Sequence, residues 1–249
     1  MSGSLVVVGT GPGKAGLITP ATAEVLAHAT DLVGYGPYLD RIPCRIGQRR
    51  HASDNGVELE RARLALSLAA AGRQVAVVSG GDPGVFAMAA AVFEAVDAGD
   101  PSWRDLDIRV EPGVTAMLAA AAEAGAPLGS DFCAISLSDN RKAWSTIERR
   151  LKAAAEADFV IALYNPASKA RPHQLGQAFD LLRGVKPKET PVLFVRAAGT
   201  AEACVVVTSL GAADPSCADM RTLVIVGAST TRQVGRWIYT PRSERGAAS

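Results

Sequence analysis

The chain has 249 residues, of which 48% are hydrophobic and 20% are charged, and its formal net charge is +1. This composition indicates a globular protein with a large core, and the near-zero charge excludes a global field that would attract nucleic acid or a membrane surface. The apolar runs have the length of strands and are too short to cross a bilayer. The first residues lead directly into an expected strand, so we expect no signal peptide and a cytoplasmic location.

The first half of the chain alternates short β-rich runs with helical patterns. The β-rich runs predict strands at 5–8, 31–34, 74–78 and 107–111. Helical patterns follow Thr19-Pro20 and the segment 112–116, and others span 57–71 and about 86–96. Because strands that alternate with helices form parallel sheets, the first lobe should be largely parallel.

A stretch rich in glycine, 125–129, separates this half from the next and predicts an N-terminal α/β lobe, 1–127, and a C-terminal α/β lobe, 128–249. Patterns in the second lobe predict strands at 132–137, 159–164, 191–196, 204–208 and 222–226, and helices at about 145–155 and 173–183. The last three strands lack long helices between them, which favours antiparallel pairs in a mixed sheet. We expect residues 242–249 to be a frayed tail.

The cysteines and histidines are too few and too scattered for a metal centre. No two of the four cysteines form a Cys-x-x-Cys pair, and the three histidines stand at positions 28, 51 and 173. We therefore expect no metal site and no disulfide framework. The thiols should be buried in a reducing compartment.

The most informative segment is Ser79-Gly80-Gly81-Asp82-Pro83-Gly84-Val85-Phe86, which follows the expected strand 74–78. Its glycines allow a ligand to approach the main chain, and open α/β sheets bind ligands at the carboxyl ends of their strands. Taken alone, the segment is equally compatible with an ordinary strand-to-helix turn.

The turn after the first strand, Gly9-Thr10-Gly11-Pro12-Gly13-Lys14, does not match a nucleotide-binding motif. A dinucleotide fingerprint requires glycine or alanine where Lys14 stands. A P-loop requires glycine at position 8 and serine or threonine at position 15, where this chain has Val8 and Ala15. The sequence therefore supports neither ATP nor NAD, and it predicts a rigid turn suited to contact with a flat ligand.

Further turns follow strands in both lobes, at 113–116, 164–166, 196–199 and 227–230. Each alone is compatible with a purely structural role, but their joint placement at strand ends favours a binding site. A loop with Tyr35 and Tyr38 precedes five basic residues: Arg41, Arg45, Arg49, Arg50 and His51. This cluster suits either a solvated surface or a polycarboxylate ligand, to which 139–142, Lys169 and Arg171 could add.

As a set, these segments resemble the tetrapyrrole methylases, the S-adenosylmethionine-dependent methyltransferases that modify uroporphyrinogen and precorrins. The likeness covers residues 4–239 and rests on Val8-Gly9-x-Gly11-Pro12-Gly13, Gly80-Gly81-Asp82-Pro83 and Pro112-Gly113-Val114-Thr115-Ala116, in the order of the family. The segments 33–38, 131–139 and 164–166 look most like the branch that methylates a precorrin at C17 and contracts its ring in cobalamin biosynthesis. The resemblance implies two α/β lobes with the active site in the cleft between them, a homodimer, and no role for nucleic acid or membrane.

The resemblance also implies which residues bind the ligands. S-adenosylmethionine, with S-adenosylhomocysteine as its product, would contact Pro12, Gly80, Gly81, Asp82, Val85, Thr115, Ala116, Asn165 and Gly199. The tetrapyrrole would face Gly11, Gly13, Tyr35 and Tyr38.

Ring contraction needs a proton to move at a bridge oxygen, and the candidates are Asp139 or the hydroxyls of Ser136 and Ser138. Asp139 could equally cap the helix that follows it. Three alternatives to this function stay open. They are another precorrin or cobalt-containing substrate, a macromolecular substrate such as rRNA or the diphthamide precursor, and a non-catalytic binding module.

Overall fold

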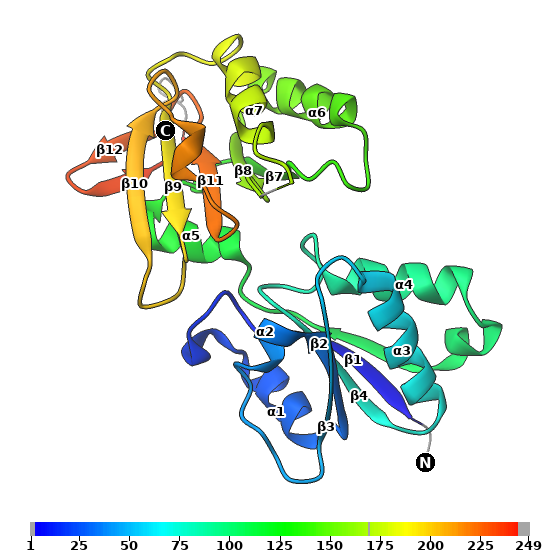
Figure 1. Cartoon of the computed structure of the whole chain (residues 1–249). Helices are drawn as coiled ribbons and strands as arrows, with labels where there is room; N and C mark the ends of the chain where they lie inside the picture. Colours follow the sequence, from blue (N-terminus) through cyan, green and yellow to red (C-terminus); the bar gives the residue numbers. More distant parts are fainter. Residues whose placement is uncertain (1–2, 169, 244–249) are drawn as a thin grey trace. The chain divides into compact units, whose positions relative to one another are not determined.

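The computed structural model describes residues 3–168 and 170–243 and divides the chain into two compact units, Met1–Ala116 and Met117–Ser249 (Figure 1). The first unit contains a five-stranded sheet in the order β3-β2-β4-β1-β5. Its strands are β1 (Ser4–Gly9), β2 (Asp31–Tyr35), β3 (Arg49–Ser53), β4 (Gln74–Ser79) and β5 (Asp107–Glu111). Every neighbouring pair is parallel, with Val7 opposite Val77 in the central pair. The expected parallel sheet is confirmed.

Helices cover both faces of this sheet because successive strand residues point to opposite sides. Val6 and Val8 pack toward α1 (Pro20–His28) and α2 (Gly36–Leu39), whereas Leu5 and Val7 pack toward α3 (Glu58–Ala70) and α4 (Met88–Ala98). Figure 1 shows the two helix pairs on opposite faces. Short 3₁₀ turns, η1 (Ala15–Leu17) and η2 (Pro101–Asp105), complete the unit. The expected start of α1 is correct, since the Thr19 hydroxyl accepts a bond from the Thr22 N–H at 3.1 Å.

Sequence patterns missed β3 and misplaced the start of α4. The basic run Arg49–Ser53 lacks the apolar character of a buried strand, yet it pairs with β2 at the margin of the sheet. Helix α4 begins at Met88 and not at residue 86, because Phe86 has a φ of 52°, which is incompatible with a right-handed helix. In α3, Ala62, Leu66 and Ala69 are buried against the sheet, whereas Ala70 is exposed.

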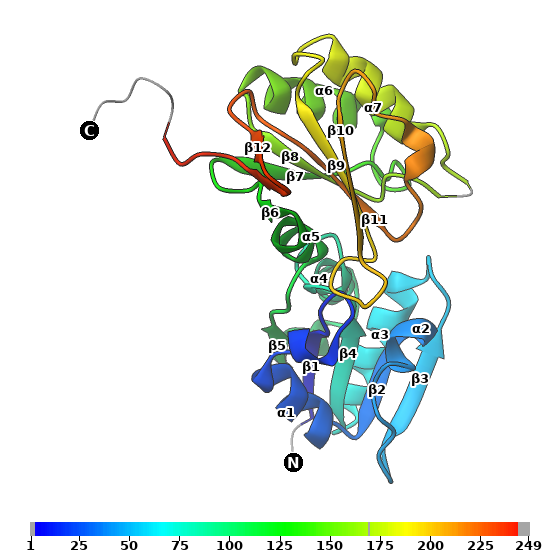
Figure 2. The same ribbon diagram turned by 90° about the vertical axis from the view of Figure 1, so that its left-hand side faces the viewer.

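The second unit contains a mixed sheet in the order β10-β9-β11-β8-β7, as expected. Its strands are β7 (Phe132–Ser136), β8 (Val160–Tyr164), β9 (Pro191–Arg196), β10 (Cys204–Ser209) and β11 (Thr222–Val226). Only β7 and β8 pair in parallel, and the other pairs are antiparallel. Helices α6 (Trp144–Glu156) and α7 (Gln174–Arg183) cover one face of this sheet (Figure 2) and enclose a core around Phe179. A 3₁₀ turn, η3 (Pro215–Cys217), follows β10.

The chain passes between the units earlier than the sequence suggests. Helix α5 (Ala116–Ala124) is followed by β6 (Gly125–Ala126), which pairs with β13 (Trp237–Tyr239) and thereby with β12 (Arg232–Val234). The Met117 N–H also donates to the Tyr164 hydroxyl at 3.0 Å. These bonds tie α5 to the second unit, whereas the sequence assigned it to a lobe ending at residue 127. The strands β6, β12 and β13 were not expected, because none has more than three residues.

Each unit has an aspartate anchored just before or at the start of a strand. Buried Asp31 accepts bonds from Arg73 at 2.7 Å and Thr30 at 2.8 Å, and lies 2.9 Å from the His51 ring. Burial alone would raise the pKa of Asp31, but these partners outweigh it and hold the pKa below its ordinary value. Burial likewise raises the pKa of Asp158, but hydrogen bonds from buried Lys186 and from Ser229 outweigh it and keep this pKa below its ordinary value.

The thiols differ from expectation. Cys44, Cys204 and Cys217 are exposed, and Cys133 is half-buried. Within the described residues, no three His, Cys, Asp or Glu side chains lie where they could hold a metal ion. No helix of the described part is long and apolar enough to cross a membrane. Of the expected tail, 244–249 lies outside the described residues.

Candidate functional site

The carboxyl ends of β1 and β4 form the topological switch point of the first unit. The two strands are neighbours, but the chain leaves β1 toward α1 on one face and leaves β4 toward α4 on the other. Diverging connections of this kind open a crevice at the strand ends, which is where open α/β sheets bind ligands. Here the Gly11 N–H donates to Gly81 O at 3.1 Å, and the Gly81 N–H donates to Gly11 O at 2.9 Å. Both glycines have positive φ, 69° and 66°.

A third turn, after β5, packs main chain against main chain with the other two. A Cβ added at Gly113 would lie 2.3 Å from Gly81 O, and one added at Gly9 would lie 2.7 Å from the Gly113 Cα. Side chains are therefore sterically excluded at both positions. We call residues 9–13, 80–84 and 113–115 the three glycine turns.

Asp82 locks two of these turns together. Its Oδ1 accepts the Gly84 N–H at 2.8 Å and its Oδ2 accepts the Gly113 N–H at 3.0 Å. The sequence singled out Asp82 as a ligand contact, and the structure gives its carboxylate a role within the protein that sequence reasoning missed.

The other cofactor candidates of the first unit lie in or beside the three glycine turns. Pro12 within the first turn and Val85 directly after the second are half-buried, and the Val85 N–H donates to Asp82 O at 3.3 Å. A Cβ at Gly81 would lie 3.8 Å from the Cα of buried Thr115 and 3.9 Å from the nitrogen of Ala116, where α5 begins. The structure thus gathers the expected first-unit residues around the place where the three glycine turns pack together.

The two tyrosines lie beside these turns in the short helix α2 and at its cap, where the sequence predicted only a loop. The Tyr38 ring rests on Gly80, because a Cβ there would come within 2.6 Å of the ring carbon Cζ. Tyr35 meets the same ring edge-on at 5.3 Å between centroids. The guanidinium of Arg41 lies 5.0 Å from the Tyr38 ring centroid.

The basic cluster divides into structural and available members. The Arg50 guanidinium donates to Leu39 O at 2.8 Å and Ile42 O at 2.6 Å, and His51 contacts Asp31. These two side chains therefore stabilise the fold. Arg41, Arg45 and Arg49 are exposed. Arg171 donates to Asn165 O at 3.3 Å in the second unit, and Lys169 lies outside the described residues.

In the second unit, β7, β8 and β9 run in one direction, so their carboxyl ends share one margin of the sheet. There the Asn165 side-chain amide donates to the Ser136 Oγ at 2.9 Å, and the Ser138 N–H donates to the same oxygen at 3.3 Å. Asn165 has a φ of 53°. Gly199 lies buried in the turn after β9, with a φ of 73°.

Asp139 accepts a hydrogen bond from the Gln174 amide at 3.2 Å. It does not cap the following helix: α6 has Ala143 at its N-cap and no capping side chain. We call Ser136, Asp139, Asn165 and Gln174 the polar cluster. Gln174 was missed because the sequence gives no sign that the start of α7 faces the end of β7.

Arg61 is a second residue that sequence reasoning missed. It is 5% exposed, and it donates to Ser53 Oγ at 2.8 Å and Asp54 O at 2.7 Å, and contacts the Met88 sulfur at 3.2 Å. Burial lowers its pKa. Because Met88 begins α4, this contact anchors the far end of the turn after β4. The signal was present, since Arg61 precedes buried Ala65 by one helical turn.

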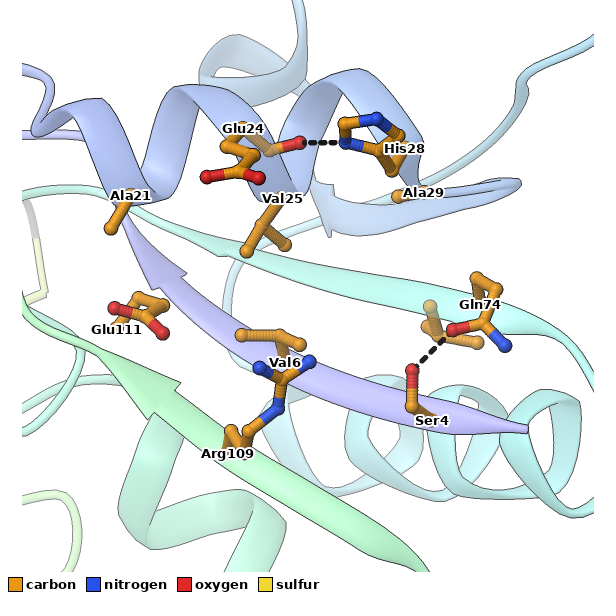
Figure 3. A pocket seen from close by; sticks show the side chains of 11 residues that line it. Ser4, Val6, Ala21, Glu24, Val25, His28, Ala29, Gln74, Arg109 and Glu111 are labelled. Atoms are coloured by element: carbon orange, nitrogen blue, oxygen red, sulfur yellow. Dashed lines mark hydrogen bonds between the residues drawn. The ribbon is translucent and has the colours of Figure 1, made fainter. Parts of the chain in front are cut away.

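A groove of about 290 Å³ lies on the α1 face of the sheet, away from the three glycine turns (Figure 3). Ser4 of β1, Glu24 and His28 of α1, Gln74 of β4, and Arg109 and Glu111 of β5 contribute its polar side chains. No residue of the three glycine turns or of α2 lines it, so it is not the candidate ligand site.

Comparison with known proteins gives one family. Residues 4–214 match the family model of the tetrapyrrole (corrin/porphyrin) methylases. The chain is 59% identical to a precorrin-3B C(17)-methyltransferase of a Sinorhizobium species, with 100% of both chains covered. It is 42% identical to a probable cobalt-factor III C(17)-methyltransferase of Salmonella typhimurium, covering 96% of this chain and 98% of the relative. A cobalamin biosynthesis protein of Mycobacterium bovis, CobIJ, is 50% identical over 97% of this chain, which spans 48% of that longer protein.

Solved structures agree with this assignment. The methyltransferase CobJ superposes with a TM-score of 0.94 at 54% identity, covering 96% of this chain and 100% of that one. A Thermus thermophilus uroporphyrin-III C-methyltransferase complexed with S-adenosylhomocysteine superposes with a TM-score of 0.67 at 22% identity, over 90% of this chain and 92% of that one. The second likeness shows that the fold is shared.

Proposed function

Because this chain belongs to the tetrapyrrole (corrin/porphyrin) methylases, we propose that it methylates precorrin-3B at C17 in cobalamin biosynthesis, with contraction of the ring. S-Adenosylmethionine is the methyl donor of this family. One observation carries the proposal: this chain is 59% identical to the Sinorhizobium enzyme, and the alignment covers both chains over their whole length.

The residues of the first unit fit the donor. A sulfonium metabolite can be held by main-chain atoms where side chains do not stand in the way, and the three glycine turns exclude side chains where they meet. Pro12, Gly80, Gly81, Asp82, Val85, Thr115 and Ala116 would hold the donor, and the resemblance to the family also assigns Asn165 and Gly199 to it. When bound, S-adenosylmethionine supplies a methyl group made electrophilic by a sulfonium sulfur.

The acceptor is an electron-rich pyrrole carbon, so the chain need not supply a nucleophile. Its task is to hold both reactants in reactive geometry and to exclude water, which can contribute about 7–11 kcal/mol at best. Gly11, Gly13, Tyr35 and Tyr38 orient the tetrapyrrole in this proposal. The Tyr38 ring rests on Gly80 and so keeps helix α2 and its N-cap, which carry the two proposed tyrosine contacts, beside a donor-binding turn.

Ring contraction requires proton transfer at a bridge oxygen, and we assign it to Asp139. The Gln174 amide donates to Asp139 Oδ2, which orients the carboxylate and leaves its second oxygen to take up a proton, as a general base requires. The Ser136 hydroxyl is the weaker candidate, because it already accepts bonds from Asn165 and Ser138.

The closing experiment for this proposal is mass spectrometry of the product formed from S-adenosylmethionine and precorrin-3B. We expect gain of one methyl group with ring contraction. Gly16→Ala is the matched control, since a Cβ at Gly16 meets no atom within 4 Å, and it should retain wild-type turnover. Absence of transfer to any tetrapyrrole, with transfer to RNA, would overturn the proposal.

A cobalt-containing substrate is the second candidate, because the Salmonella relative named for cobalt-factor III aligns over 96% of this chain. Parallel incubations with precorrin-3B and cobalt-factor III separate the two. The higher kcat/KM identifies the substrate.

The resemblance to the family also supports a homodimer that acts in the cytoplasm. Sedimentation of the purified protein at micromolar concentration should give twice the chain mass of 25.8 kDa. A monomer at that concentration would contradict this part of the proposal.

A further inference from the structure

A second cavity of about 290 Å³ adjoins the first glycine turn. Thr10, Gly13, Ala15 and Ile18 line one side of it, and Arg41 and Ile42, which follow α2, line the other. Arg41 is the charged residue in this lining. All these residues belong to the first unit, and Gly13 is also a tetrapyrrole contact in the proposed function.

Arg41 is the member of the basic cluster that can bind a ligand there. Arg50 is bound to main-chain carbonyls and His51 to Asp31, while Arg45 and Arg49 do not line the cavity. Among the described residues, no carboxylate lies within 4 Å of the Arg41 guanidinium. Its positive charge is therefore available for an external anion.

The surroundings define the shape of that anion. The Arg41 guanidinium lies over the Tyr38 ring, which limits its movement and leaves its N–H groups free to form a bidentate pair with a carboxylate. Ala15, Ile18 and Ile42 offer apolar contact to a short methylene chain. The Thr10 hydroxyl donates to Ser79 O at 2.9 Å, so it is already engaged within the protein.

We propose that this cavity binds one acetate or propionate side chain of the tetrapyrrole, with Arg41 as the counter-ion of its carboxylate. The inference rests on the proposed function and adds a subsite that fixes how the macrocycle is oriented. The Arg41 guanidinium lies over the Tyr38 ring, and that ring rests on Gly80. A carboxylate bound to Arg41 therefore also orders Tyr38 beside a donor-binding turn.

Steady-state kinetics with precorrin-3B test the subsite. We expect Arg41→Gln to raise the KM for the tetrapyrrole about tenfold, while the Kd for S-adenosylhomocysteine stays within twofold. Arg41→Lys should recover part of the loss, because it keeps the charge but not the bidentate geometry. The matched control is Arg63→Gln, which removes an equally exposed charge from α3 and should leave KM unchanged.

Arg45→Gln separates a specific subsite from a diffuse basic surface, since Arg45 is exposed nearby but does not line the cavity. A KM increase in Arg45→Gln equal to that in Arg41→Gln would overturn the subsite. An unchanged KM in Arg41→Gln would also overturn it. The same holds if Arg41→Gln raises the Kd for S-adenosylhomocysteine and lowers the melting temperature together, because that result indicates a structural role. If the wild-type protein does not methylate the tetrapyrrole, the proposed function fails together with the subsite. If it does and Arg41→Gln has wild-type KM, the subsite alone fails.

Discussion

The two units use the carboxyl ends of their strands in different ways. In the first unit, the three glycine turns pack main chain against main chain and leave no room for side chains where they meet. In the second unit, the corresponding sheet margin carries the polar cluster. Its hydrogen bonds join Ser136 of β7 to Asn165 in the turn after β8, and Asp139 in the loop after β7 to Gln174 of α7. A main-chain surface suits the binding of a metabolite by shape, whereas a side-chain cluster can move a proton. The difference predicts that substitutions in one unit affect donor affinity and those in the other affect turnover.

The largest effect should come from Asp139→Asn in the polar cluster. If Asp139 is the general base, kcat for the ring-contracted product falls by about 10² to 10⁴. The affinity for S-adenosylhomocysteine, measured by calorimetry, should change less than twofold. Asp131→Asn is the matched control, an exposed aspartate just before β7. Full turnover by Asp139→Asn would break the comparison, because the second unit would then lack its proposed chemical role.

Gly113→Ala is the corresponding test of the first unit. The added Cβ would lie 2.3 Å from Gly81 O, which forces two of the three glycine turns apart. We expect the Kd for S-adenosylhomocysteine to rise about 100-fold, the loss typical of a misplaced binding group. Gly16→Ala controls for the added methyl group. Because the variant also affects packing, its melting temperature is measured alongside, and binding at wild-type strength by the folded variant would contradict the prediction.

Arg61→Met sharpens the comparison by removing a buried guanidinium that bonds the end of β3 and contacts the first residue of α4. The substitution leaves Ser53 Oγ and Asp54 O without their donor, so the free energy of unfolding should fall by about 2 kcal/mol. Urea denaturation measures this loss. Arg63→Met, on the exposed side of α3, is the control and should change stability by less than about 0.5 kcal/mol.

The smallest effect concerns acid stability. The pKa of Asp31 lies below its ordinary value of 3.8, so its ionised form stabilises the folded protein above that pH. This contribution is lost as the pH falls from about 4 through the depressed pKa. We expect Asp31→Asn to lower stability by about 1–2 kcal/mol at neutral pH and to flatten the dependence of unfolding on pH below 4. If the free energy of unfolding of Asp31→Asn falls with pH below 4 as steeply as that of the wild type, Asp31 is not the source of this pH dependence.

Sequence reasoning succeeded where the backbone itself dictates the residue. Glycines at 11, 81 and 113 are required by positive φ or by close packing of turns, so the three glycine turns were visible in the sequence, and their role in donor binding stays a prediction. The alternation of strands and helices likewise gave both sheets their correct character.

It failed where distant side chains decide the outcome. The bond between Asp139 and Gln174 joins residues 35 positions apart, and buried Arg61 meets Met88 27 positions further along the chain. Strand β3 was hidden because a basic strand at the margin of a sheet has no apolar pattern. The identity of these partners depends on the packed structure and not on local spacing.

The junction between the units has a consequence for how such a protein can evolve. The chain enters the second unit at Met117, directly after Thr115 and Ala116, and pairing of β6 with β13 fastens that exit within the second unit. Recombination at the contact boundary would therefore fall directly beside two residues assigned to the donor and would split helix α5 after its first residue. A new C-terminal half could be acquired only if it also supplied a compatible helix at this seam, so the halves are expected to be inherited together and not exchanged as separate modules.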